Sequence, residues 1–437
     1  MKLYTENTFL NKKNLTPLLI NYFAFGLQVL LGFLIVAIIL SYMSVSDLGI
    51  FTQTYTILII SSQFFVTGLN DTVLKKLSTL SKNDNEIAII TNILTASFIN
   101  VFVMSIIFYL FQSELYLIFE SEGLIINNKF ICIAIFFLTV NKVFFSILQG
   151  KRFFNSFAFF NFLRPFLIFC CILSNLIYEN TINFSLVFSL VEFVIFILLL
   201  VRINIKKYLN FYLINLINIK SHYNFGFKVF INSFLSESFI RVDIIMVGIL
   251  LNDKMVGMYC LAALFFEGIF QFSIVIRNVI NPEIGRLYKN KNYKSLIQLI
   301  RYSSLLSFLV TIFGSIIIFF LIPYVLFFIE ISIIDETLNL VKFLLFGLVL
   351  YSLIIPSENL LFQSNNPTIQ SLYMLTLVFL NIILNFFMIS QYGVLGAAVA
   401  TSMTYFCAPI IFNLFIIFFT ELKSGIFIYP RIIKKFN

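Results

Sequence analysis

Residues 184–201 read FSLVFSLVEFVIFILLLV, an apolar run that contains a single charged residue, Glu192. A helix needs about 20 apolar residues to cross the hydrocarbon core of a bilayer, which is roughly 30 Å thick. Runs of this kind fill nearly the whole 437-residue chain. Backbone groups cannot be left unpaired in lipid, and the runs are too long for barrel strands of alternating polarity. We therefore expect membrane-spanning α-helices.

The sequence predicts twelve spans in two sets of six. The first set covers about 17–40, 48–69, 87–111, 124–149, 153–177 and 182–202, and the second covers about 224–251, 256–280, 296–322, 336–362, 367–390 and 394–419. Hydrophobic residues make up 60% of the chain, charged residues make up 11%, and the mean hydropathy is +1.00. Because a water-soluble globule cannot bury that much apolar surface, we expect an all-α polytopic membrane protein with about twelve transmembrane helices.

The distribution of Lys and Arg predicts the orientation in the membrane. Of these 29 residues, 22 lie on alternate loops and at the termini, whereas the opposite loops carry mostly Asp and Glu. Since cytoplasmic loops are enriched in Lys and Arg, both termini are expected in the cytoplasm. The net charge of +9 follows from this topology, and no nucleic-acid partner is expected.

The chain contains two similar halves. Residues 46–51 (SDLGIF) follow the first span and residues 254–259 (KMVGMY) follow the seventh, so a turn with a central glycine recurs at the same place. Six crossings return the chain to its starting side, which makes the halves parallel repeats with a path for cargo between them. We expect six-helix bundles at 1–202 and 224–437 around a central cavity, joined by a cytoplasmic linker at 203–223.

Residues typical of catalytic and metal centres are scarce. His222 is the only histidine, and the five cysteines lie inside predicted spans, where they are expected to be apolar side chains. The sequence has no Cys or His pair at ligand spacing and no Gly-rich phosphate loop. It therefore predicts a protein that is not an enzyme, with no catalytic residue, metal site or cofactor.

Several short motifs occur in an order that resembles one family. They are residues 48–53 (LGIFTQ), 68–71 (GLND), 243–248 (DIIMVG), 281–284 (NPEI) and 392–398 (YGVLGAA). Together with the twelve spans and the duplication, they resemble the Wzx-type polysaccharide flippases of the multidrug/oligosaccharidyl-lipid/polysaccharide exporter (MOP) superfamily. The resemblance covers essentially the whole chain.

This resemblance implies a cargo and a location. The cargo would be a polyprenyl-diphosphate-linked oligosaccharide repeat unit, moved by alternating access from the cytoplasmic to the periplasmic leaflet of the bacterial inner membrane. The process served would be O-antigen or capsule assembly, with membrane lipids, a polysaccharide polymerase and a chain-length regulator as further partners. Two alternatives stay open: a cation-coupled multidrug exporter of the same superfamily, and a membrane polysaccharide polymerase or glycosyltransferase. The short outer loops argue against the enzyme.

Cationic residues inside the spans are the candidate cargo ligands. A charge at the bilayer centre costs at least about 2.5 kcal/mol, so it usually faces the bundle interior or a wet cavity. A diphosphate needs a compensating cation, and a guanidinium offers it a planar fork of donors. The candidates are Arg164, Arg241, Lys142 and Arg277, the last two being nearer the cytoplasmic interface.

Acidic residues inside the spans form a second candidate set. They are Glu192, Glu237, Asp243 and Glu267. A desolvated carboxylate can bind H⁺ or Na⁺ and couple cargo movement to an ion gradient. The alternative is a set of internal ion pairs with Arg164 and Arg241. Glu237 and Arg241 are four residues apart on one helix face and can neutralise each other.

We predict that the linker 203–223 is cytoplasmic. In a variant without native cysteines, a cysteine placed in this segment should react with a membrane-impermeant maleimide only after the membrane is permeabilised. A cysteine at Lys254, on a loop of the opposite class, is the matched control and should react in intact cells. Labelling of the linker in intact cells would contradict the topology.

Overall fold

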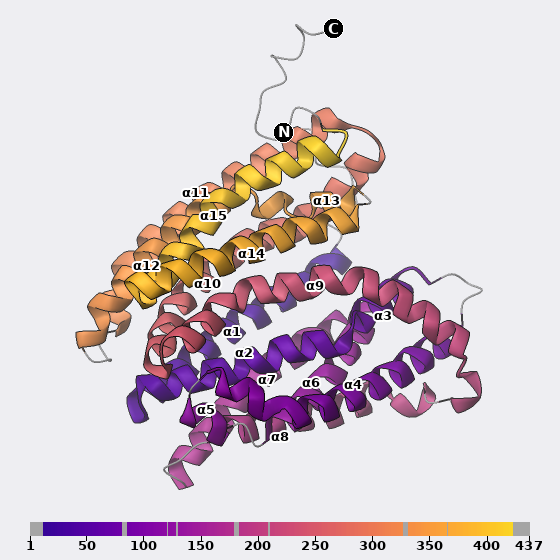
Figure 1. Cartoon of the computed structure of the whole chain (residues 1–437). Helices are drawn as coiled ribbons and strands as arrows, with labels where there is room; N and C mark the ends of the chain where they lie inside the picture. Colours follow the sequence, from indigo (N-terminus) through magenta and orange to yellow (C-terminus); the bar gives the residue numbers. More distant parts are fainter. Residues whose placement is uncertain are drawn as a thin grey trace, which may run out of the picture. The chain divides into compact units, whose positions relative to one another are not determined.

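The computed structural model describes residues 12–80, 85–119, 121–127, 130–178, 183–208, 210–326, 331–364 and 366–422. Within these ranges the chain is helical and has no strand (Figure 1). The first half contains α1 Lys12–Tyr42, α2 Val45–Val66, α3 Leu69–Ser78, α4 Glu86–Leu117, α5 Glu122–Asn127, α6 Ile131–Gly150, α7 Phe154–Tyr178 and α8 Phe184–Ile203. The second contains α9 Leu216–Leu250, α10 Asp253–Lys289, α11 Tyr293–Leu326, α12 Ile331–Tyr351, α13 Leu360–Gln363, α14 Pro367–Tyr392 and α15 Val394–Phe419. Short 3-10 helices are η2 Ile205–Lys207, η3 Phe211–Leu213 and η4 Ile355–Ser357.

Among the described residues each predicted apolar run coincides with α-helix, which confirms the expected all-α membrane fold. In the run at 124–149 the long helix, α6, begins only at Ile131, after the short helix α5. Among the described residues, nine helices are long and apolar enough to cross a bilayer. The pair Asp335–Tyr351 and Ile355–Gln363, bent by 52°, makes a tenth if it is counted as one span. The run at 336–362 is therefore a broken helix, which the hydropathy pattern did not predict.

Two predicted spans, α1 and α9, do not meet the same criteria for a membrane helix. The apolar part of α1 that qualifies among the described residues is the short stretch Gly26–Tyr42. The 35-residue helix α9 is long enough, but Glu237, Arg241 and Asp243 lie close together in it. The terminal segments 1–11 and 423–437, predicted to be cytoplasmic, lie outside the described residues.

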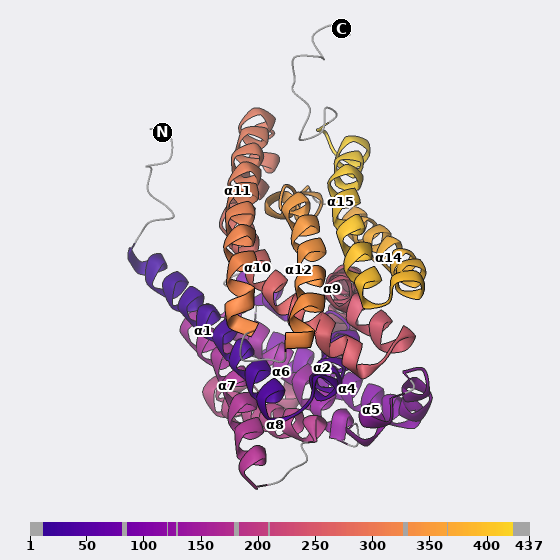
Figure 2. The same ribbon diagram turned by 90° about the vertical axis from the view of Figure 1, so that its left-hand side faces the viewer.

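The chain forms two compact units with a common packing pattern. Unit 1 comprises 1–43, 57–118 and 122–230, and unit 2 comprises 44–56, 119–121 and 231–437. In unit 1, α6 packs against α3, α4, α7 and α8. In unit 2, α12 packs against α10, α11 and α15, and Figure 2 shows α12 between α11 and α15. The fourth span of each half thus packs against the third and the sixth span of its own half, which are α4 and α8 for α6 and α11 and α15 for α12. The domain boundaries at 202 and 224 stay a prediction.

Polar residues fix where the second span of each half begins. Ser44 and Asp47 form a capping box at the start of α2, in which the Asp47 amide donates to Ser44 Oγ at 3.1 Å and the Ser44 amide donates to Asp47 Oδ2 at 2.9 Å. Asn252 caps α10 by accepting from the Met255 amide at 3.1 Å. The two repeated glycine turns therefore lie at the starts of equivalent helices.

The segment between the halves is attached to unit 1. Asn92 of α4 donates to the Leu213 carbonyl at 3.0 Å. Lys151, which follows α6, pairs with Glu86 at 2.5 Å and donates to the Tyr208 hydroxyl. Burial lowers the pKa of Lys151, but the hydrogen bonds with Glu86 and Tyr208 outweigh it, so this pKa lies above its ordinary value. The linker is thus a folded part of the first half.

Candidate functional site

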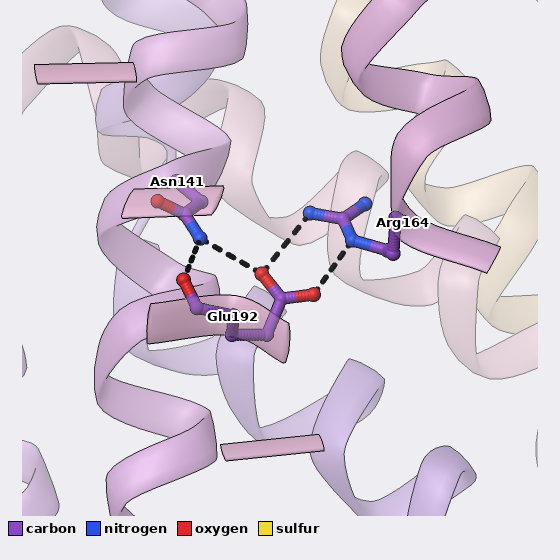
Figure 3. A network of polar contacts seen from close by, with 3 residues as sticks. All are labelled: Asn141, Arg164 and Glu192. Atoms are coloured by element: carbon purple, nitrogen blue, oxygen red, sulfur yellow. Dashed lines mark hydrogen bonds and ion pairs between the residues drawn. The ribbon is translucent and has the colours of Figure 1, made fainter. Parts of the chain in front are cut away.

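Arg164 of α7, Glu192 of α8 and Asn141 of α6 meet in the interior of unit 1 (Figure 3). Arg164 Nε donates to Glu192 Oε1 at 2.6 Å, and a second guanidinium nitrogen donates to Oε2 at 3.2 Å. Asn141 Nδ2 donates to the Glu192 carboxylate at 2.8 Å and to the Glu192 carbonyl at 2.9 Å. Glu192 therefore has two independent sets of donors, one charged and one neutral.

The pair of Arg164 and Glu192 is largely shielded from solvent, so each charge needs a partner. The Glu192 side chain is only 4% exposed and that of Arg164 is 19% exposed. The guanidinium also lies 5.1 Å from the centroid of the Phe145 ring, at a distance typical of a cation–π contact. A buried charge that loses its partner is strongly unfavourable. Glu192 thus compensates Arg164, and an anionic ligand would have to take the place of that carboxylate.

Lys142 faces a different neighbour from Arg164. It follows Asn141 on α6, and its ammonium donates to Gln63 Oε1 at 2.8 Å and to the Ile59 carbonyl at 3.4 Å, both on α2. Both of these acceptors are neutral oxygens of α2.

In unit 2, three predicted site residues lie near one another. Arg241 pairs with Glu237 at 2.8 Å along one face of α9, as the four-residue spacing allowed. Glu267 of α10 is exposed and interacts electrostatically with Arg241. Arg241 thus has two carboxylates nearby: Glu237 forms an ion pair with it, and Glu267 interacts with it electrostatically.

Arg277 is held where the broken span bends. Its guanidinium donates to Glu358 Oε2 at 2.5 Å, and the Tyr351 hydroxyl donates to Glu358 Oε1 at 2.5 Å. Glu358 directly follows η4, the short helix between α12 and α13. This ion pair ties α10 to the break and gives Arg277 a structural partner.

Asp243 of α9 differs from the other three candidate acids because its hydrogen-bond partners are neutral. It is 5% exposed and accepts hydrogen bonds from the Tyr259 hydroxyl at 2.9 Å and from Asn385 Nδ2 at 2.8 Å. Thr401 and Asn381, also buried, adjoin this cluster. None of the ion pairs found among the described residues includes Asp243. A buried carboxylate among hydroxyl and amide groups can hold a proton or a hard cation such as Na⁺.

Sequence reasoning missed the neutral members of these clusters. They are Asn141, Tyr259, Tyr351, Asn381, Asn385 and Thr401. Buried polar groups are expensive in an apolar span unless they are hydrogen bonded, so amides in the middle of a run are a usable signal. The spacing of Asn381 and Asn385 on one helix face was the clearest such sign.

Comparison with known proteins supports the fold. Residues 229–387 match the MatE family model. The structure of the lipid II flippase MurJ in an inward closed conformation superposes with a TM-score of 0.76 at 15% identity, covering 91% of this chain and 87% of that one. An inward-facing multidrug resistance MATE transporter of the MOP superfamily gives a TM-score of 0.67 at 13% identity, covering 88% and 92%.

A third similar structure is a mutant of the MATE transporter VcmN of Vibrio cholerae. Its TM-score is 0.64 at 12% identity, and the match covers 92% of this chain and 96% of that one. No curated protein matches the sequence. Residues 229–387 thus match the MatE family model, and the chain as a whole has the fold of these solved transporter structures.

Proposed function

We propose that the protein is a flippase that moves a polyprenyl-diphosphate-linked oligosaccharide from the cytoplasmic to the periplasmic leaflet of the bacterial inner membrane. The observation that carries this proposal is the half-buried position of Arg164 in the middle of an apolar span. A guanidinium there suits a diphosphate better than it suits a cationic or apolar drug. The similarity to the lipid II flippase MurJ over 91% of the chain supports the same class of cargo.

The contacts of Glu192 indicate how an anion can be accepted. If a diphosphate takes the guanidinium of Arg164, Glu192 loses its charged partner but its carboxylate keeps the hydrogen bond that Asn141 Nδ2 donates to Oε2. That bond lowers the cost of leaving the carboxylate buried. Arg164 is therefore proposed as the head-group ligand, and Asn141 as the residue that holds Glu192 during the exchange. Lys142, Arg241 and Arg277 remain further proposed ligands.

Asp243 is the proposed site for a coupling ion. Its carboxylate is buried among neutral oxygen and nitrogen groups, so uptake of H⁺ or Na⁺ would compensate its charge directly. Glu192 and Glu237 already have arginine partners and are weaker proposals, and Glu267 lies near Arg241. Ion binding at Asp243 would supply the free-energy source for net movement of cargo.

A multidrug exporter is the second candidate function. The MatE match and the similarity to MATE transporters favour it, and cation coupling at Asp243 would serve it equally well. An exporter of cationic drugs would gain nothing from a diphosphate-binding arginine, so Arg164 separates the two proposals.

Deletion of the gene tests the proposed function in the cell. The mutant should lose long-chain surface polysaccharide while the lipid-linked repeat unit is still made and accumulates in the inner leaflet. Complementation with the wild-type gene is the control. Loss of synthesis of the lipid-linked unit would favour an enzyme, and normal polysaccharide with increased drug sensitivity would favour the exporter.

Variants of the buried pair test whether Arg164 binds cargo. Glu192→Gln alone should cost up to about 3–5 kcal/mol of stability, because it leaves the Arg164 charge without its carboxylate. Arg164→Gln alone should cost less, because Asn141 still donates to the Glu192 carboxylate. The double variant should recover the melting temperature but not transport, and Arg164→Lys should keep partial transport. Arg286→Gln, in the exposed pair with Glu283, should cost less than about 1 kcal/mol. Full transport by the double variant would contradict the ligand role.

A sodium-dependent melting shift tests Asp243. An ion that binds only the folded state stabilises it by about 2.7 kcal/mol at 100 times its dissociation constant. Na⁺ should therefore raise the melting temperature of the wild type but not that of Asp243→Asn, and K⁺ should raise neither. Asp335→Asn, at an exposed position, should respond like the wild type. If H⁺ is the ion, Na⁺ gives no shift and Asp243→Asn removes the pH dependence of transport. Identical responses of wild type and Asp243→Asn to both ions would refute the assignment.

A further inference from the structure

Cationic side chains gather around two aromatic rings at one end of unit 1. The ammonium of Lys151, which follows α6, lies 5.8 Å from the centroid of the Phe153 ring and 4.6 Å from that of the Tyr208 ring. The guanidinium of Arg202, in the last turn of α8, lies 5.3 Å from the Phe153 centroid. The ammonium of Lys207, in η2, lies 5.8 Å from the Tyr208 centroid. These distances are typical of cation–π contacts. We call the five residues the basic corner.

The basic corner carries more positive than negative charge. Glu86, which pairs with Lys151 at 2.5 Å, is the one carboxylate that forms an ion pair with it among the described residues. Two further cations, Arg152 and Lys206, directly adjoin the corner in the sequence and are exposed. Like charges held close together repel unless an anion lies among them. The corner therefore has room for an anion that the protein itself does not supply.

Arg202 is oriented for such an anion by two neighbours. Its Nε donates to the Ser156 hydroxyl of α7 at 2.9 Å, and its Cζ lies beside the Phe153 ring. Within the described ranges, no hydrogen-bond partner occupies its terminal nitrogens. A guanidinium presents its donors as a planar fork that matches the oxygens of a phosphate. The ligand class that fits this corner best is thus a phosphate group.

Exposed apolar side chains lie next to these cations in the sequence. Val201, which precedes Arg202, is 75% exposed, and Phe153 and Phe154, which follow Arg152, are exposed as well. At the end of a membrane helix such side chains contact acyl chains, while the long stems of Lys and Arg carry their charges to the headgroups. This combination favours a phosphate attached to acyl chains over one dissolved in water.

We propose that the basic corner binds the phosphate headgroup of an anionic phospholipid of the cytoplasmic leaflet. The Lys and Arg distribution predicts that the loops after the fourth and sixth spans, which hold the corner, are cytoplasmic. Basic pockets between membrane helices on that side suit anionic headgroups. Arg202 and Lys207 would hold the phosphate, and Lys151 would stay paired with Glu86. The lipid would also tie η2 to the ends of α6 and α8, whatever cargo the protein moves.

The chain contains no tryptophan, which makes the site directly measurable. Val201→Trp would place a single fluorophore beside Arg202. The full-length protein is reconstituted in phosphatidylcholine vesicles that contain a minor fraction of phosphatidylglycerol, and the acyl chains of one or the other lipid are brominated so that they quench tryptophan on contact. Tyr302→Trp is the matched control, because Tyr302 of α11 is also exposed and also follows an arginine.

The quenching gives the local preference for phosphatidylglycerol over phosphatidylcholine. We expect this preference to be at least about fivefold greater at Val201→Trp than at Tyr302→Trp, since each additional Lys or Arg at an anionic surface raises the affinity about fivefold. Equal preference at the two positions would overturn the proposal.

Charge variants in the Val201→Trp background test the two proposed ligands. Arg202→Gln/Lys207→Gln should remove the excess preference, whereas Arg202→Lys/Lys207→Arg should retain most of it because the charge is kept. Lys289→Gln/Lys294→Gln removes the same charge from exposed positions of unit 2 and should leave the preference unchanged. A preference that survives the loss of both Arg202 and Lys207 would also overturn the proposal.

Competition identifies the source of the phosphate. Inorganic phosphate should not displace phosphatidylglycerol, because it makes no apolar contact with the exposed side chains. Polyprenyl diphosphate, added at the same mole fraction as phosphatidylglycerol, should displace no more than an equal share of it. Complete displacement by inorganic phosphate would make the corner a site for a soluble anion, and preferential displacement by polyprenyl diphosphate would make it a site for a cargo head group. Either result would overturn the assignment to a phospholipid.

Discussion

Compensation of charge in an apolar interior is the constraint on which the arrangement of the polar residues depends. Each of three arginines in the predicted spans is in contact with a carboxylate: Arg164 with Glu192, Arg241 with Glu237 and Arg277 with Glu358. An unpaired charge at the bilayer centre would cost at least about 2.5 kcal/mol, so these pairs allow the helices to be inserted and packed. They also define the chemistry of a ligand, because an anion that binds one arginine must replace a carboxylate.

The exception to this rule is as informative as the pairs. Asp243 is buried with neutral partners, so its charge is compensated only by hydrogen bonds in the described part of the chain. Unit 1 thus holds the pair of Arg164 and Glu192, and unit 2 holds, beside its own two arginine–carboxylate pairs, a carboxylate with neutral partners. The proposed flippase uses the first for cargo and the second for coupling.

The sequence predicted the fold more fully than it predicted the site. Helices could be predicted because lipid allows a long apolar run few other conformations. The pair of Glu237 and Arg241 followed from helical spacing, since both residues lie on one helix. That Arg164 pairs with Glu192 depends on how α7 and α8 pack against each other, and the hydropathy pattern does not specify this packing. The neutral hydrogen-bond donors to Asp243, Tyr259 and Asn385, come from two other helices, α10 and α14, and lie 16 and 142 positions away in the sequence.

The most direct test of the central claim is flipping by the purified protein in liposomes. The cargo is a fluorescent polyprenyl-diphosphate oligosaccharide, and a proton or sodium gradient is imposed across the membrane. The account predicts gradient-driven movement of the lipid-linked sugar to the opposite leaflet, and none by a stably folded Arg164→Gln/Glu192→Gln variant. Gradient-driven export of a cationic dye without movement of the lipid-linked sugar would contradict it.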